Sequence, residues 1–442
     1  MDERIIKVGL CGFGVVGQGV FNHLDKKAAM LGEKLGARFV VTRIAVRDTS
    51  KARDFEFDPS ILCSDPMSVA TDPEVEIVCE LMGGIEIPLE VCLAALKAGK
   101  VVVTANKAML CYHGAELLDA AKLGGGHILF EASVAGGVPI IKALNEGLAI
   151  NSFSTILGIL NGTSNYILTR MANEGLSYEE ILVDAKELGY AEADEALDVG
   201  GGDTAHKAVV LAYLAHGRWV PYEDLIVQGV TEVTQDDIQF AKDNEYSIKL
   251  LAVIAKTRKS GKLYISILPT LVPLKYVLGR VDGVYNAVSV RGDVVGETVY
   301  IGPGAGRDAT ASSVIADLVD SAKLLLLGGI ENRFPFLDPA PSHGVEIELA
   351  EPEEIESRYY VRLLVKDLPG VLAEVTASLA SYDVSLASVL QKEVGEDAQK
   401  ASLILTTHST TEKAILEALE ALEKLDNVEA KPFSMPIGNF ED

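Results

Sequence analysis

Short apolar runs alternate, along the N-terminal part of the chain, with segments whose apolar residues recur at helical spacing. The runs predict five β-strands, at residues 5–10, 39–46, 76–81, 101–103 and 127–130. Strands that alternate with helices predict an α/β fold, in which a parallel sheet is connected by right-handed crossovers.

The middle of the chain mixes strand and helix patterns, as an α+β domain does. Strands are predicted at residues 263–268, 287–290 and 297–301, and a long helix at 310–327 is expected to return to the first domain. Three prolines and an acidic run then predict a linker. The chain is therefore divided into a first domain (1–133, completed by 307–330), a second domain (134–306), the linker (331–356) and a C-terminal module (357–436).

The C-terminal module has its own order of elements. Strands are predicted at residues 359–366, 384–391 and 400–407. One helix opens at the turn Asp367-Leu368-Pro369-Gly370-Val371-Leu372, and a second helix is predicted at 412–425. This order, βαββαβ, predicts a ferredoxin-like module.

A glycine-rich turn joins the first predicted strand to the first predicted helix. It reads Gly12-Phe13-Gly14-Val15-Val16-Gly17, and its glycines would admit a pyrophosphate to the N-terminus of the helix. The motif alone is a weak signal, but the strand before it and the helix after it supply the context that dinucleotide binding requires. We therefore predict a Rossmann-type dinucleotide-binding domain; a turn that is merely rich in glycine is the alternative.

Basic residues follow the second predicted strand. Arg47 comes first, with Lys51 and Arg53 close behind, where an NAD-preferring enzyme usually carries an acid for the ribose hydroxyls. The basic residues favour the 2′-phosphate of NADP, with NAD as the alternative cofactor. Arg47 can also be interpreted as a solvated loop residue.

Loops after the next two strands are expected at the same edge of the sheet. Gly83 and Gly84 follow one strand, and Thr104, Asn106 and Lys107 follow the other. Parallel sheets bind ligands outside the carboxyl ends of their strands, so these residues are predicted to line the nicotinamide end of the cofactor. The alternative for Lys107 is an ordinary surface lysine.

An acidic loop, three glycines and a helical run follow one another between residues 187 and 217. Four carboxylates lie within residues 192–198, three glycines loosen the backbone at 200–202, and Asp203 stands where the helix begins. Asp203 and Lys207 are four residues apart and therefore share one helix face. A lysine among carboxylates can exchange a proton with a small polar substrate. An N-cap with a surface ion pair is the alternative.

Two further segments, residues 131–139 and 158–166, are rich in small and polar residues. In the first, Glu131 stands among small residues whose carbonyls could bind a hard cation, but a hinge at the exit of the first domain is the simpler interpretation. The second segment lies between an apolar strand and an amphipathic helix, where it either binds a cofactor or closes a turn.

Composition narrows the classes of function. The chain has 442 residues, of which 48% are hydrophobic and 23% charged, as expected for a folded protein of several domains. Its net charge of -25 argues against a nucleic-acid partner and leaves small molecules. No apolar run reaches membrane length, and the N-terminus MDERIIKVGL lacks the regions of a signal peptide, so a cytoplasmic protein is expected. Five cysteines without a CxxC pair are interpreted as core thiols.

Several motifs together resemble the homoserine dehydrogenase family. They are the glycine turn, the Thr104-Ala105-Asn106-Lys107 segment, EASVAGGVP from Glu131, GILNGTSNYIL from Gly158, and LGYAEAD…DVGGGDTAHK. The resemblance covers residues 1 to about 330. It implies the NAD(P)-dependent interconversion of L-aspartate 4-semialdehyde and L-homoserine in threonine and methionine biosynthesis, with residues 134–306 binding homoserine and forming the dimer. A different dehydrogenase with the same tail, or a nucleotide sensor without catalysis, is the alternative.

The resemblance also implies roles for single residues. Lys207 would donate and accept the proton, and Lys107 would assist at both substrate and cofactor. The implied substrate-binding residues are Glu192, Asp198, Asp203 and Lys107. Gly189 and Gly306 join the cofactor-binding residues. A sodium ion is implied at Glu131, Val134, Gly136 and Val138.

The C-terminal module resembles the ACT domain, which binds amino acids. The resemblance implies an effector, L-threonine, whose carboxylate would meet the free N–H groups of the first helix of the module. The residues expected at the effector are Asp367, Gly370 and Asp383. The ammonium of the ligand would meet Asp367 or Asp383, at a site between paired modules of neighbouring subunits. A ferredoxin-like interaction module without a ligand is the alternative. A homodimer or homotetramer is expected.

Overall fold

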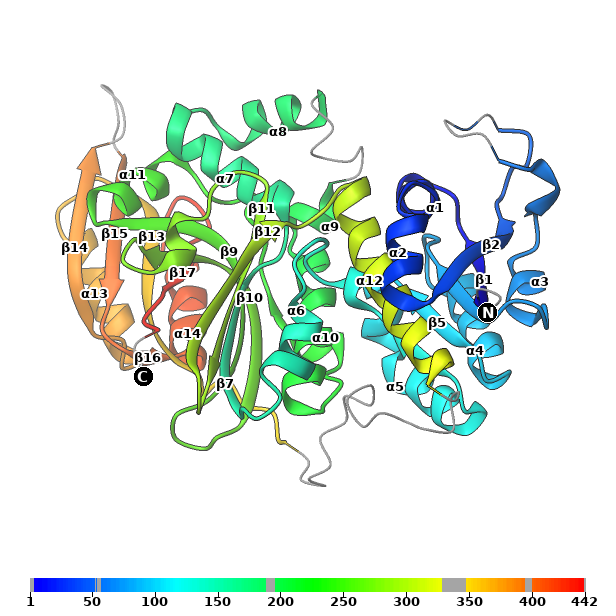
Figure 1. Ribbon diagram of the computed structural model, residues 1–442. Coiled ribbons are helices and arrows are strands. Elements are labelled where there is room, and N and C mark those ends of the chain that lie inside the picture. Colours follow the sequence, from blue (N-terminus) through cyan, green and yellow to red (C-terminus); the bar gives the residue numbers. More distant parts are fainter. Residues whose placement is uncertain are drawn as a thin grey trace. The chain divides into compact units, whose positions relative to one another are not determined.

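The computed structural model describes residues 4–51, 53, 57–187, 195–327, 347–393 and 400–440 (Figure 1). Contacts divide the chain into two compact units. The first unit holds Met1–Phe153, Asp203–Asp224 and Val284–Val345, and the second holds Ser154–Gly202, Leu225–Gly283 and Glu346–Asp442. Each unit therefore gathers segments that are far apart in the sequence.

A six-stranded sheet forms the centre of the first unit. Its strands are β1 (Arg4–Cys11), β2 (Ala37–Ala45), β3 (Leu62–Cys63), β4 (Ile77–Glu80), β5 (Val101–Thr104) and β6 (His127–Leu129). Neighbours in the order β3-β2-β1-β4-β5-β6 are all parallel. The order reverses between β1 and β4, and sheets of this kind bind ligands at that reversal. All five predicted strands are present to within two residues; the two-residue β3 is the strand that the pattern does not predict.

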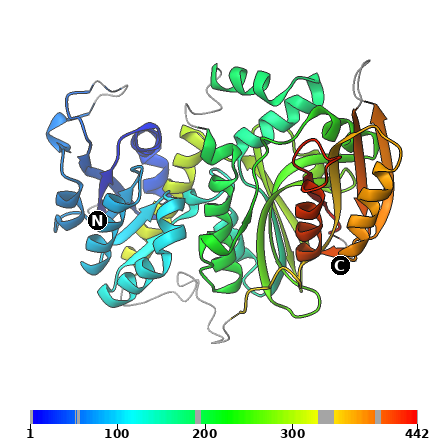
Figure 2. The same cartoon turned by 180° about the vertical axis from the view of Figure 1, so that it is seen from behind.

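Helices cover both faces of this sheet, as Figures 1 and 2 show from opposite sides. One face carries α1 (Val15–Lys26), α2 (Ala28–Leu35) and α12 (Arg307–Leu326), and the other carries α3 (Pro66–Thr71), α4 (Glu86–Lys97) and α5 (Lys107–Gly124). The α/β fold predicted from the alternation of strands and helices is therefore confirmed.

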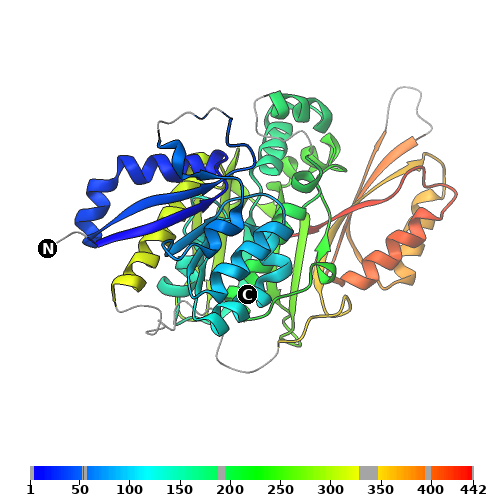
Figure 3. The same ribbon diagram turned by 90° about the vertical axis from the view of Figure 1, so that its right-hand side faces the viewer.

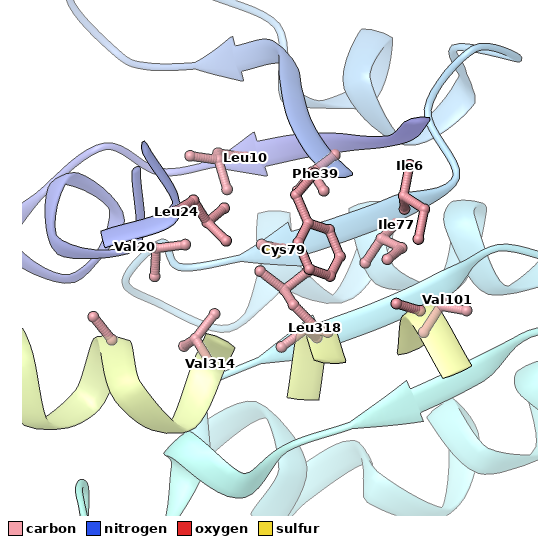
Figure 4. Packing of buried hydrophobic residues seen from close by; sticks show 14 of the residues in the cluster. Ile6, Leu10, Val20, Leu24, Phe39, Ile77, Cys79, Val101, Val314 and Leu318 are labelled. Atoms are coloured by element: carbon pink, nitrogen blue, oxygen red, sulfur yellow. The ribbon is translucent and has the colours of Figure 1, made fainter. Parts of the chain in front are cut away.

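The late helix α12 belongs to the core of the first unit. Fully buried Val314 and Leu318 of α12 pack with Ile6, Leu10 and other side chains from the sheet (Figure 4). The helix also lies close to α1, since a Cβ on Gly19 would stand 2.8 Å from the Cγ atom of Arg307. The predicted return of residues 310–327 to the first domain is thus confirmed.

The remaining elements of the first unit are short, apart from one helix and one hairpin. The hairpin pairs β11 (Tyr285–Gly292) with β12 (Gly296–Pro303), so both strands predicted there are present and longer than expected. The other elements are η2 (Glu131–Ser133), α6 (Ile140–Lys142), η3 (Ala143–Gly147), α10 (Gly202–His216) and η4 (Tyr222–Asp224).

The second unit contains a mixed sheet in the order β7-β9-β10-β17-β13-β15-β14. Its strands are β7 (Phe153–Ile159), β8 (Ile226–Val227), β9 (Tyr246–Lys256), β10 (Leu263–Pro273), β13 (Glu356–Lys366), β14 (Leu386–Glu393), β15 (Lys400–Thr407), β16 (Thr410–Thr411) and β17 (Phe433–Ile437). Its helices are α7 (Gly162–Glu174), α8 (Tyr178–Glu187), α9 (Ala196–Val199), α11 (Gln235–Asp243), η5 (Val277–Arg280), α13 (Val371–Ser381) and α14 (Glu412–Glu423).

The C-terminal module has the predicted βαββαβ order. Its strands lie in the order β17-β13-β15-β14, and α13 and α14 cover one face of them (Figure 3). Val375 and Leu379 of α13 and Ile415 and Leu422 of α14 are buried against the sheet in a separate core. The ferredoxin-like fold expected for this module is therefore confirmed.

The module is joined to the rest of the second unit through a shared sheet. Its last strand, β17, pairs antiparallel with β13 and parallel with β10, where Ile437 lies opposite Leu271. Ahead of the module, the backbone N–H of Ala350 donates to the carbonyl of Leu263 at 2.9 Å, and Ile355 is buried. The described end of the predicted linker is therefore packed against β10.

A buried carboxylate links the module to helix α11. Asp237, which is fully buried, accepts hydrogen bonds from the Thr234 backbone N–H at 2.8 Å and the Tyr360 hydroxyl at 2.6 Å. It also pairs with the Arg362 guanidinium at 2.8 Å. Because Tyr360 and Arg362 belong to β13, one side chain caps the helix and holds the module.

Replacing Asp237 should loosen this connection. Asp237→Asn removes the charge that faces Arg362, and we expect the free energy of unfolding to fall by about 1.5–3 kcal/mol, the range for a hydrogen bond to a charged group. The matched control is Asp236→Asn, a half-buried neighbour on the same helix turn, for which a change within about 0.5 kcal/mol is expected. Urea unfolding followed by circular dichroism measures both. Equal midpoints for the two variants would contradict the assignment.

Candidate functional site

The glycine turn after β1 has the geometry that a dinucleotide needs. A Cβ on Gly12 would lie 2.4 Å from the Leu81 carbonyl oxygen, and one on Gly17 would lie 2.3 Å from the Gly12 carbonyl oxygen, so both positions exclude larger residues. Gly14, in contrast, is exposed, and a Cβ placed on it would meet no other atom within 4 Å. It is also the N-cap of α1 and offers no side-chain cap, so the first N–H groups of the helix face an open approach.

The other residues of the turn divide between core and surface. The Phe13 ring is buried and meets Phe21 and Phe57 edge to face, with centroids 5.6 Å away in both cases. Val15 is exposed, while Val16 packs against the core of the unit. The backbone of the turn is therefore fixed by Phe13 and Val16, and its exposed side is formed by Gly14 and Val15.

One of the basic residues after β2, Arg53, lies beside this turn. Arg47 is exposed. The guanidinium of Arg53 lies 5.9 Å from the centre of the Phe13 ring and donates to the carbonyls of Lys51 and Asp48, at 2.6 and 2.7 Å. The sequence indicated a basic segment, and the structure places Arg53 in particular next to the glycine turn.

The loops after β4 and β5 are tied together by a buried carboxylate that the sequence interpretation missed. Glu80 ends β4 and accepts the Thr104 hydroxyl at 2.6 Å and the Met82 backbone N–H at 2.8 Å. Asn106 donates from its side chain to the Gly84 carbonyl at 2.8 Å and caps α5 by accepting the Met109 backbone N–H. Thr104 is completely buried, so its hydroxyl faces these partners and does not line the surface of the site.

Asp203 lies between two lysines. Its carboxylate is 2.7 Å from the Nζ atom of Lys207, four residues along α10, and 3.0 Å from the Nζ atom of Lys107, the first residue of α5. The side chains of Asp203 and Lys207 are only 6% and 10% exposed, whereas Lys107 is 36% exposed. The predicted pairing of Asp203 with Lys207 is present, and it is a buried contact rather than a surface ion pair.

Asp198 is held within the second unit by the polar loop before α7. The Asn161 side chain donates to the Asp198 carboxylate at 2.8 Å, and the Ser164 hydroxyl donates to the Asp198 carbonyl at 3.0 Å. Asn161 also caps α7 through the backbone N–H of Ser164. The segment 158–166 therefore caps the N-terminus of α7 and holds Asp198 in place. The sequence interpretation did not single out Asn161, although its position before an amphipathic helix is typical of an N-cap.

Two of the three glycines after Asp198, Gly200 and Gly201, stand where a larger residue would be strained. Gly201 has φ +90°, and a Cβ there would lie 3.1 Å from Val227 and 3.2 Å from Ile267. Two residues of the predicted site, Glu192 and Gly189, lie outside the described residues. Gly306, which was expected at the cofactor, is the N-cap of α12 with φ +106° and has open space around it, as do Gly83 and Gly84.

The segment predicted to hold sodium is tightly hydrogen-bonded. Both carboxylate oxygens of Glu131 accept backbone N–H groups, from Ile141 at 3.0 Å and Lys142 at 2.8 Å. Burial nevertheless raises the pKa of Glu131 to about 7. The carbonyl of Gly136 accepts the Ser313 hydroxyl, and that of Val138 accepts the Ile140 N–H. Each oxygen keeps a further lone pair, so these contacts are compatible with a cation, and the sodium site stays a prediction.

The three residues predicted for the effector do not meet within one module. Asp367 and Gly370 stand at the N-terminus of α13, where Asp367 accepts the Gln391 side chain at 3.1 Å. Asp383 follows the other end of that helix, about 16 Å away at 1.5 Å per residue, and takes a left-handed φ of 57°. All three are exposed.

The cysteines, possible metal ligands and helices bear on other kinds of site in the part of the chain that the structure describes. All five cysteines are free. Four are buried, as expected for core thiols, whereas Cys63 is half-buried. The described residues contain no group of three histidine, cysteine or acidic side chains placed to hold a metal ion. No described helix is long and apolar enough to cross a membrane.

Comparisons with known proteins agree with this geometry. Family models described as the NAD-binding domain of homoserine dehydrogenase, homoserine dehydrogenase and the ACT domain match residues 12–131, 139–319 and 359–427. A homoserine dehydrogenase from Pseudomonas aeruginosa is 41% identical to this chain over 96% of both proteins.

Two solved structures extend the comparison. A homoserine dehydrogenase from Thiobacillus denitrificans is 38% identical and covers 99% of both chains with a TM-score of 0.90. A hyperthermophilic archaeal homoserine dehydrogenase in complex with NADPH is 27% identical, covers 72% of this chain and 98% of its own, and has a TM-score of 0.61. The chain belongs to the homoserine dehydrogenase family, as an NAD(P)-dependent oxidoreductase with a C-terminal ACT domain.

Proposed function

We propose that the chain is an NADP-preferring enzyme that interconverts L-aspartate 4-semialdehyde and L-homoserine. The observation that carries this proposal is the position of the Asp203 carboxylate between the ammonium groups of Lys207 and Lys107. Both lysines lie on helices of the unit that also carries the glycine turn. The residues of that turn fit a dinucleotide, because Gly14 leaves an open approach to the start of α1.

Lys207 is the residue that we assign to proton transfer. When bound, the nicotinamide supplies the hydride that the aldehyde carbon receives. The ammonium of Lys207 would stabilise the negative charge that develops on the substrate oxygen and then donate the proton. In the oxidative direction the same side chain must act as a neutral amine, so oxidation should be favoured at alkaline pH, since a free lysine titrates near ~10.4.

Asp203 would orient both lysines. A carboxylate within 3.0 Å of two ammonium groups fixes their rotamers through charge-assisted hydrogen bonds. Its further predicted role is to bind the polar end of homoserine together with Asp198, Lys107 and Glu192. The Asn161 contact holds Asp198 ready for such a role. These residues would contribute orientation of the substrate more than chemistry.

Turnover is tested by absorbance of the reduced nicotinamide, with L-homoserine and NADP or NAD. Lys207→Ala should lower kcat by roughly 10²–10⁴-fold, the usual contribution of a positioned acid or base, and leave the Kd for NADPH nearly unchanged. The control is Lys97→Ala, which removes an exposed lysine at the end of α4. Loss of NADPH binding in parallel with the rate would show that Lys207 is structural.

Arg47 and Arg53 support the preference for NADP. Arg47 is exposed directly after β2, and Arg53 lies against the glycine turn, so both can approach a 2′-phosphate. The archaeal relative, whose complex contains NADPH, is consistent with this choice.

Reversing the charge at Arg47 should change cofactor preference. In Arg47→Asp, the partner of the 2′-phosphate is replaced by an acceptor for the ribose hydroxyls, so the ratio of kcat/KM for NADP to kcat/KM for NAD should fall at least ~10-fold, about 1.4 kcal/mol. Arg38→Asp, on an exposed position of β2, is the control. An unchanged ratio in Arg47→Asp would remove this residue from the phosphate site.

The cellular setting belongs to the same proposal. The enzyme would act in the cytoplasm, in threonine and methionine biosynthesis, as a homodimer or homotetramer. Sodium at Glu131, Val134, Gly136 and Val138 would stiffen the exit of the dinucleotide-binding domain, without a part in the chemistry. The ACT domain would bind L-threonine, the end product, and inhibit the enzyme.

Threonine inhibition is best tested by point substitutions. Removing the whole module would strip β17 from β10 and expose a sheet edge. Asp367→Asn, at the start of α13, should raise the threonine concentration for half inhibition by ~10-fold or more, because a charged partner of the ligand ammonium is lost. Asp383→Asn removes the other predicted partner of the ammonium and should raise that concentration as well. Wild-type inhibition in both variants, or no inhibition of the intact enzyme, would remove threonine from this site.

A further inference from the structure

Glu80 is a fully buried carboxylate at the carboxyl end of β4, beside the reversal of strand order. Burial raises its pKa to about 7, against the opposing effect of its hydrogen bonds. The titratable groups that face it are thiols: Cys11 of β1, Cys92 of α4, and Cys79 next to it on β4. Burial raises the pKa of all three thiols, so they stay neutral and supply no countercharge. A buried carboxylate without a countercharge is costly, and the hydrogen bonds of Glu80 offset only part of that cost.

The hydrogen bonds of Glu80 join two loops into one ring. One oxygen accepts the N–H of Met82, which begins the Gly83-Gly84 loop, and the other accepts the hydroxyl of Thr104 at the end of β5. The Thr104 oxygen in turn accepts the N–H of Asn106 at 3.0 Å. The Asn106 side chain closes the ring by donating to the carbonyl of Gly84.

The ring also sets the start of helix α5. Asn106 is the N-cap of that helix and accepts the N–H of Met109 at 3.1 Å, so its position fixes the first turn. Lys107 is the first residue of the helix, and its ammonium reaches Asp203, which also holds Lys207. A displacement of Asn106 would therefore displace Lys107 and let Asp203 rotate about Lys207.

We propose that Glu80 is a positioning residue, which couples the Gly83-Gly84 loop to the pair of lysines through Thr104 and Asn106. The assignment rests on the proposed function, because it takes Lys107 and the loop to lie at substrate and cofactor. Glu80 itself is buried and touches neither. Its effect is to keep the cofactor loop and the start of α5 in one arrangement.

The carboxylate form is the one that makes the ring. A carboxylate accepts both the Met82 N–H and the Thr104 hydroxyl, whereas a protonated carboxyl must use one oxygen as a donor. The Met82 N–H can only donate. Protonation of Glu80 therefore either breaks the contact with Met82 or reverses the direction of the hydrogen bond with Thr104. Because the pKa of Glu80 is raised to about 7, the ring should be complete above that pH and weaken as the pH falls through it.

The test compares Glu80→Gln with Glu90→Gln, which neutralises an exposed carboxylate on α4. Turnover of L-homoserine and the Kd for NADPH are measured between pH 6 and pH 9. This interval runs from about one pH unit below the pKa of Glu80 to about two pH units above it. Glu80→Gln should lower kcat/KM by ~10²-fold, the cost of a misplacement of about 1 Å, and weaken NADPH binding. The wild type and Glu90→Gln should share a change in NADPH affinity near pH 7, and Glu80→Gln should lack it.

A second variant keeps the proposal testable if Glu80→Gln does not fold. Thr104→Val replaces threonine by a residue of nearly the same volume that lacks the hydroxyl. It removes one hydrogen bond of the ring and leaves Glu80 in the sequence, so it should reproduce the loss of kcat/KM. Kinetics and pH dependence equal to those of the wild type in either variant would overturn the role of Glu80. Absence of turnover in the wild type would instead refute the proposed function, so the two failures are distinguishable.

Discussion

The close approach of Gly12 to Leu81 is the constraint on which the first unit depends. Parallel pairing of β1 with β4 brings the Leu81 N–H to the Cys11 carbonyl at 2.7 Å, and the chain beyond has room only for a glycine. The glycine turn and the loop after β4 therefore leave the sheet side by side. The uncapped start of α1 and the ring around Glu80 lie in these two neighbouring segments.

Single carboxylates hold separate segments together throughout the structure. Glu80 joins the ends of β4 and β5, Asp203 joins α10 to α5, and Asp237 joins α11 to β13. Asp198 does the same for the loop before α7. Each of these carboxylates accepts hydrogen bonds from two or more donors of the protein, so its charge is stabilised by the protein itself. Some of the acidic side chains that contribute to the net charge of -25 are therefore hydrogen-bonded inside the protein and do not face solvent.

The sequence revealed those parts of the site whose geometry is local. The glycine turn and the i, i+4 relation of Asp203 and Lys207 both depend on neighbouring residues, and periodicity describes neighbours well. The contact of Lys107 with Asp203 and the ring around Glu80 depend on how β4, β5 and two helices pack, which no spacing encodes. Strand β9 was missed because its continuous apolar run reads equally as a buried helix. Gly370 and Asp383 stand at opposite ends of α13, so an effector site that uses both stays a prediction.

The position of β17 also bears on how the chain folds during synthesis. This strand follows β10 and β13 in the chain, yet it lies between them in the sheet, so both are made before it. Until it arrives, two strand edges are unpaired, and unpaired edges invite association between chains. Closing the sheet joins residues as distant as Leu271 and Ile437, and contacts of such long range form slowly. The sheet of the second unit therefore cannot close until β17 has been synthesised.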